Sequence, residues 1–161
     1  EVWRAPYPEW SQLSELASRD YLVSSNEVDG RIFVWSMAGG VVVLDSEDGG
    51  HILSTVVSLP DSLSDVRHSS EGGWLLLLNG GSVALLEDLE SEPTVVRTPG
   101  PVSDAVHDGK DWKWTGWRHD GAIIDGEVQC ISREQVGVAL VGDRVLTNDG
   151  DWDDFRLNHS D

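Results

Sequence analysis

Residues 40–53 read GVVVLDSEDGGHIL, two short apolar runs joined by an acidic turn that ends in two glycines. Short runs rich in β-branched residues and bounded by Gly, Asp and Asn are typical of strands connected as hairpins. Glycine and aspartate at such turns supply the positive φ that tight hairpins need. Because the first run is apolar without alternation, we expect a strand that is buried on both faces.

Small dipeptides like the one that opens this stretch recur along the chain. They are Gly39-Gly40, Gly80-Gly81, Asp120-Gly121 and Asp149-Gly150, at intervals of 41, 40 and 29 residues. A β-rich run precedes each predicted turn, namely Arg31–Ser36, Trp74–Leu78, Trp112–Trp117 and Arg144–Thr147. Repeats of about 40 residues that hold several strands are typical of propeller blades. The sequence therefore predicts an all-β fold, a β-propeller or propeller segment of about four antiparallel blades, with a β-sandwich as the alternative.

These repeats divide the chain into four predicted blades, over residues 21–61, 62–101, 102–132 and 133–161. We expect three complete four-stranded blades and a fourth that ends after its third strand, near Asn158. An unclosed set of blades exposes a sheet edge, which invites pairing. Three ways of closing it remain open: the N-terminal segment supplies the missing strand, the chain is part of a larger propeller, or a partner or second copy completes it.

The repeats resemble those of the WD40 and PQQ-type propeller families. The resemblance is carried by Gly40–Leu53 and by Asp65–Leu86, and it extends over about residues 21–158. The Gly-His and Trp-Asp dipeptides of typical WD40 repeats are absent, and Leu44-Asp45 is the nearest counterpart of the second. The resemblance implies a rigid scaffold that binds another protein or subunit, because propellers commonly serve that role.

The first 20 residues differ from the repeats. Pro6 and Pro8 indicate an extended start, and Trp10, Leu13 and Leu16 then recur at helical spacing. We therefore predict a short amphipathic N-terminal helix within residues 1–20. Its apolar residues, together with the nearby Trp3, are candidate partner-binding residues. These candidates are Trp3, Trp10 and Leu13.

The charge balance is strongly acidic, with 29 Asp and Glu against 11 Lys and Arg and a formal net charge of -18. At molar salt the Debye length falls to about 3 Å, which removes most of this self-repulsion. The composition resembles that of halophilic archaeal proteins, and an acidic protein with basic partners is the alternative. The balance argues against nucleic-acid binding and against adsorption to anionic membranes. No apolar run approaches the roughly 20 residues of a membrane span, so we expect no membrane insertion and a cytoplasmic location.

Three of the eight tryptophans, Trp112, Trp114 and Trp117, lie in one short segment. Such a cluster indicates either an aromatic platform for a partner or a sugar ring, or core packing between blades. His68 and His107 occupy matching repeat positions, which favours a repeated structural hydrogen bond over a metal or catalytic role. Cys130, the single cysteine, lies in the run Val128–Ile131 and is expected in the core.

Carboxylates at Asp149, Asp151 and Asp153 alternate like the start of a calcium loop, but the closing glutamate is missing. Calcium is therefore the one cofactor that the sequence suggests. No nucleophile elbow, phosphate-binding glycine loop or HExxH motif is present, so no catalytic residues are predicted. The leading hypothesis is a non-catalytic interaction scaffold or subunit of a larger assembly in a salt-adapted organism. A ligand- or carbohydrate-binding propeller with a tryptophan-rich site is the alternative.

Overall fold

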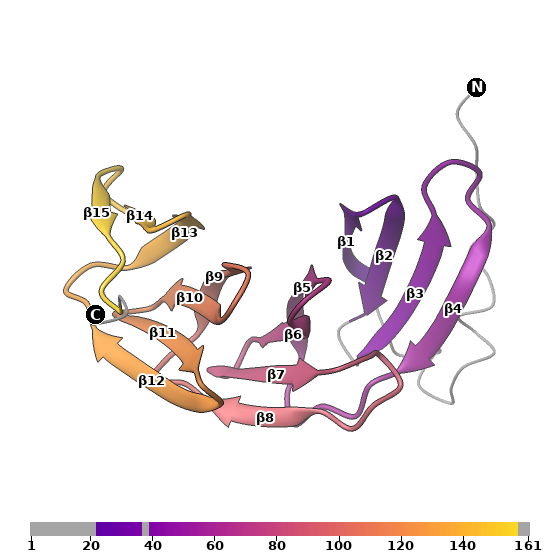
Figure 1. The fold of residues 1–161 in the computed structure, drawn as a ribbon, viewed down its shortest axis with the longest axis horizontal. Helices are drawn as coiled ribbons and strands as arrows, with labels where there is room; N and C mark the ends of the chain where they lie inside the picture. The colour runs from indigo at the N-terminus through magenta and orange to yellow at the C-terminus, as the bar shows by residue number, and fades with distance from the viewer. Residues whose placement is uncertain (1–21, 37–38, 158–161) are drawn as a thin grey trace.

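The protein is an all-β chain of four antiparallel sheets, seen in a computed structural model that describes residues 22–36 and 39–157. The sheets follow one another around an open arc, with the first and last sheets at its two ends (Figure 1). The predicted all-β architecture of about four antiparallel blades is confirmed. The predicted N-terminal helix, with Trp3, Trp10 and Leu13, lies outside the described residues.

Each sheet is a simple meander in chain order. The first two sheets contain β1 (Leu22–Val28), β2 (Arg31–Ser36), β3 (Gly40–Asp45) and β4 (His51–Val56), then β5 (Leu63–Ser69), β6 (Gly73–Leu78), β7 (Ser82–Leu86) and β8 (Thr94–Arg97). The last two contain β9 (Val102–His107), β10 (Trp112–Gly116), β11 (His119–Ile124) and β12 (Glu127–Ser132), then β13 (Gly137–Val141), β14 (Arg144–Thr147) and β15 (Trp152–Asp154). Among the described residues, the last sheet has three strands where the others have four, as the sequence predicts.

The core lies between neighbouring sheets, where the middle strands pack face to face. The first cluster joins the first and second sheets through residues that include Phe33, Trp35, Trp74 and Leu76. On the other face of β6, alternate leucines pack against the third sheet, in a cluster that includes Leu75, Leu77, Trp112 and Trp114. Burial on both faces explains why β6 is a continuous apolar run rather than an alternating one.

Three of the four predicted turns lie between strands, and the third does not. Asp120 and Gly121 lie inside β11, and the chain instead turns at Trp117 and Arg118. Gly121 is required by packing, because a Cβ at this position would overlap the Trp114 indole. Arg118 takes the left-handed backbone conformation, with a φ of 58°, that a glycine usually supplies. The turn predicted at Asp120-Gly121 is therefore wrong. The glycine is there because the Trp114 indole packs closely against the backbone of β11.

The outer strands are β4, β8 and β12, at the rim of the arc (Figure 1). Every residue of β12 is exposed, including Cys130. The core position predicted for Cys130 is wrong, because an outermost strand lies beyond the faces where sheets pack together. In the part of the chain that the structure describes, no helix is long and apolar enough to cross a membrane.

Candidate functional site

The tryptophan-rich segment divides between the core and the surface. Trp112 and Trp114 point toward the second sheet and are 4% and 0% exposed. Lys113, between them, points the other way, toward the last sheet. Trp117 lies in the turn after β10 and is 59% exposed. Of the three tryptophans in this segment, all predicted to bind a partner, Trp117 alone offers an exposed ring.

The turn that carries Trp117 is fixed on several sides. The Trp117 N–H donates to the Pro101 carbonyl at 3.0 Å, and the Arg133 N–H donates to the Arg118 carbonyl at 2.7 Å. His119 Nδ1 lies 3.1 Å from the Trp117 carbonyl oxygen. We call Trp117, Arg118 and the exposed Pro101 the Trp117 tip. Tryptophan and arginine are the side chains most enriched at binding hot spots, and a fixed backbone lowers the entropy lost on binding.

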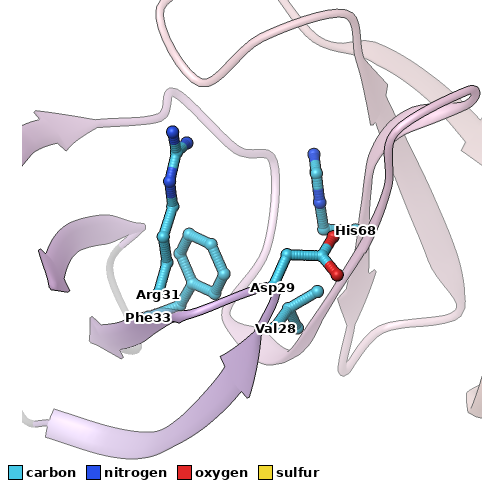
Figure 2. A pocket seen from close by; sticks show the side chains of 5 residues that line it. All are labelled: Val28, Asp29, Arg31, Phe33 and His68. Carbon is cyan, nitrogen blue, oxygen red and sulfur yellow. The ribbon is translucent and has the colours of Figure 1, made fainter. Parts of the chain in front are cut away.

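A cavity of about 240 Å³ lies between the first two sheets and is lined by Val28, Asp29, Arg31, Phe33 and His68. Figure 2 shows the Asp29 carboxylate near His68 and the Arg31 side chain beside Phe33. The Phe33 ring is 2% exposed and packs edge-on against Trp74, with ring centroids 4.6 Å apart. We call this site the His68 cavity.

The matching position of the next junction, beside Gly72 and His107, has a cavity of its own, of about 290 Å³. There the Trp112 Nε1–H donates to the Gly72 carbonyl at 2.9 Å, and a Cβ on Gly72 would overlap the His107 ring. The turn that carries Gly72 has three residues between the paired Ser69 and Gly73, whereas Asp29 and Gly30 alone turn the chain in the first sheet. The two cavities therefore lie beside turns of different length.

His68 and His107 differ accordingly. His107 Nδ1 accepts a hydrogen bond from the Gly109 N–H at 3.2 Å, whereas His68 Nδ1 is buried without a hydrogen-bond partner among the described residues. Burial lowers the pKa of His68 and the Arg31 charge lowers it further, while the Asp29 carboxylate opposes both. The lower pKa favours a neutral His68 ring at neutral pH. The repeated hydrogen bond predicted for the two histidines is therefore present in His107 alone within the described structure.

The three carboxylates of the predicted calcium loop do not converge. Asp149 and Asp151 are exposed, and Asp153 Oδ2 lies 3.1 Å from Arg133 Nη2 and 3.2 Å from Arg156 Nη2. Within residues 22–36 and 39–157, no group of three or more His, Cys, Asp or Glu residues is arranged to hold a metal ion. The guanidinium groups of Arg133 and Arg156 thus balance the charge of Asp153.

The open face of the last sheet was not anticipated from the sequence. Val141 is 62% exposed and Trp152 is 50% exposed, and neither belongs to a described core cluster. The far edge of β15 is partly covered, because Arg133 Nη2 donates to the Asp154 carbonyl at 2.9 Å. A side chain that covers an edge carbonyl is one way to discourage the addition of a further strand.

Comparison with solved structures finds the same kind of fold in a known propeller. The chain is similar to the WD40 domain of Neurospora crassa Pan2, with a TM-score of 0.63 and 12% sequence identity. The fold is β-propeller-like. The match covers 84% of this chain and 46% of the Pan2 domain, so the chain spans less than half the length of that propeller. No protein-family model matches the sequence, and no curated protein does.

Proposed function

We propose that this protein is a non-catalytic interaction scaffold, a subunit of a larger assembly, that binds a protein partner through the Trp117 tip. The observation that carries the proposal is an exposed tryptophan beside an arginine on a turn held by hydrogen bonds from two neighbouring segments. The two β10 tryptophans, Trp112 and Trp114, lie in the core, so the exposed Trp117 ring is not needed to fill space there. Hot spots of this composition commonly dominate protein interfaces.

The net charge of the chain indicates what kind of partner it binds and how salt affects the binding. A net charge of -18 favours a partner that presents basic groups near the contact, and Arg118 at the tip favours a carboxylate within it. Adaptation to high salt would weaken long-range attraction and leave the aromatic contact as the main source of affinity. The carbohydrate-platform alternative is less well supported, because two of its three rings are buried.

The test is capture of a partner from native lysate at multimolar KCl with the tagged protein as bait. Trp117→Ala should weaken binding at least about 30-fold, the effect of losing a central hot spot. Trp152→Ala is the matched control, since this tryptophan is also half-exposed but lies on the last sheet. A stoichiometric partner that both variants retain would place the interface elsewhere. A bait without any partner would contradict the scaffold function itself.

A further inference from the structure

The His68 cavity brings together two opposite charges that do not meet. Arg31 and Asp29 both line the cavity. Among the described residues, neither forms an ion pair, with the other or with any third residue. Figure 2 shows the Arg31 guanidinium and the Asp29 carboxylate as separate groups around the same space. A ligand that satisfies both must itself carry a carboxylate and a cationic hydrogen-bond donor.

The rest of the lining consists of Val28, Phe33 and His68, and the volume is small. Phe33 and Val28 form an aromatic and aliphatic wall. A volume of 240 Å³ corresponds to about eight waters at ~30 Å³ each, which is below the ~300–1,000 Å³ of drug-sized sites. We propose that the His68 cavity binds a free α-amino acid with an aliphatic side chain. The carboxylate contacts Arg31, the amino group contacts Asp29, and the side chain lies against Phe33.

The charged lining of the cavity differs from that of its counterpart at the next junction. Asp29 has a φ of 51°, the conformation that an aspartate before a glycine takes in a two-residue hairpin turn, and Asp125 has the same φ. The counterpart is a cavity of about 290 Å³ that is lined by Gly72, His107 and Trp112 and whose cation is Lys110. Within the described residues, a lining arginine beside a lining aspartate is thus found in the first of these two cavities and not in the second.

The first experiment is calorimetric titration of the full chain with L-leucine and two matched analogues. 4-Methylpentanoate lacks the amino group and isopentylamine lacks the carboxylate, while both keep the aliphatic chain. Leucine should bind with a dissociation constant of about 1 mM or tighter, and each analogue at least tenfold more weakly. Equal binding of all three, or no leucine binding at 50 mM (a concentration about fifty times that constant), would overturn the proposal.

Two variants then assign the contacts. Arg31→Gln should weaken leucine binding at least about tenfold and leave isopentylamine binding unchanged. Asp29→Asn, which tolerates the left-handed backbone, should weaken leucine and leave 4-methylpentanoate unchanged. Arg144→Gln is the control, because Arg144 follows the equivalent turn of the last sheet and lies outside the cavity. Unchanged leucine binding by Arg31→Gln would overturn the assignment. This site is independent of the Trp117 tip, so its failure leaves the proposed function standing.

Discussion

The first and last junctions between sheets perform the same structural task with opposite chemistry. Between the first and second sheets, the buried groups are apolar and include Phe33, Trp35 and Leu76. Between the third and last sheets, a small apolar cluster around Val145 and Phe155 is surrounded by buried charge. That charge comes from Asp120, which is 0% exposed, and Arg133, which is 5% exposed, together with Lys113, which is 6% exposed.

The charged junction is stabilised by specific polar contacts more than by buried apolar surface area. Arg133 Nε lies 2.8 Å from Asp120 Oδ1, a close charge contact without hydrogen-bond geometry. Asp120 also accepts hydrogen bonds from Thr115 Oγ1 at 2.8 Å and from the Arg156 N–H at 2.9 Å. Lys113 Nζ lies 2.9 Å from Asp108 and 3.3 Å from Asp143. Such a junction depends on each partner being present, whereas an apolar junction loses stability in proportion to the atoms removed.

Removing one charge should have the largest effect. Arg133→Met leaves the Asp120 carboxylate buried and uncompensated, and should lower the free energy of unfolding by about 3–5 kcal/mol. Urea denaturation at a fixed KCl concentration measures this loss. The double variant Asp120→Asn/Arg133→Met removes both charges and should be clearly more stable than the single variant. A loss below about 1 kcal/mol in Arg133→Met would mean that the pair contributes no more than an exposed ion pair does.

Truncation in the apolar junction should have the next largest effect. Leu76 is fully buried between the first and second sheets, and Leu76→Ala should cost about 2–5 kcal/mol through lost burial and a residual cavity. Leu146→Ala, at a half-buried position of the last sheet, is the matched control and should cost much less. Equal losses in the two variants, measured by the same denaturation, would show that the first junction is not a closely packed core.

Acid should weaken the charged junction selectively, with the smallest effect of the three. Burial acts to raise the pKa of Asp108, but hydrogen bonds from the Asp111 and Lys110 N–H groups and from Lys113 outweigh it and hold this pKa far below its usual value. A depressed folded-state pKa contributes stability that is present above the unfolded value of about 3.9 and lost as pH falls below it. Asp108→Asn should therefore reduce the loss of stability between pH 5 and pH 2.

The control for that prediction is Asp149→Asn, which changes an exposed carboxylate outside the junction. Its stability should follow the wild-type pH profile. Parallel profiles for Asp108→Asn and the wild type would show that the charge contact between Asp108 and Lys113 does not stabilise the fold.

The contrast between the junctions also explains what the sequence could predict. Continuous apolar runs such as Leu75–Leu78 signal strands buried on both faces, so the blades and the short fourth sheet follow from pattern alone. Asp120-Gly121 looks like a turn, because nothing local reveals that Arg133 neutralises the aspartate and that Trp114 covers the glycine. In an acidic chain, a buried carboxylate cannot be told by composition from an exposed one.

The functional sites show the same limit. The segment from Trp112 to Trp117 was selected by its tryptophans, but strand alternation alone does not say which ring is exposed. The lining of the His68 cavity comes from two sheets, so no local stretch of sequence reveals it. The matching histidines did signal equivalent positions. The difference between them becomes visible only when the neighbouring turns are compared.

The most direct test of the central claim, binding through the Trp117 tip, is hydrogen–deuterium exchange of the full chain with and without its captured partner. We expect added protection at the turn between β10 and β11 and in the segment around Pro101, whose carbonyl accepts a hydrogen bond from the Trp117 N–H. The first and last junctions should exchange at unchanged rates. Protection confined to β13–β15, with the Trp117 turn unaffected, would contradict the claim and move the interface to the open face of the last sheet.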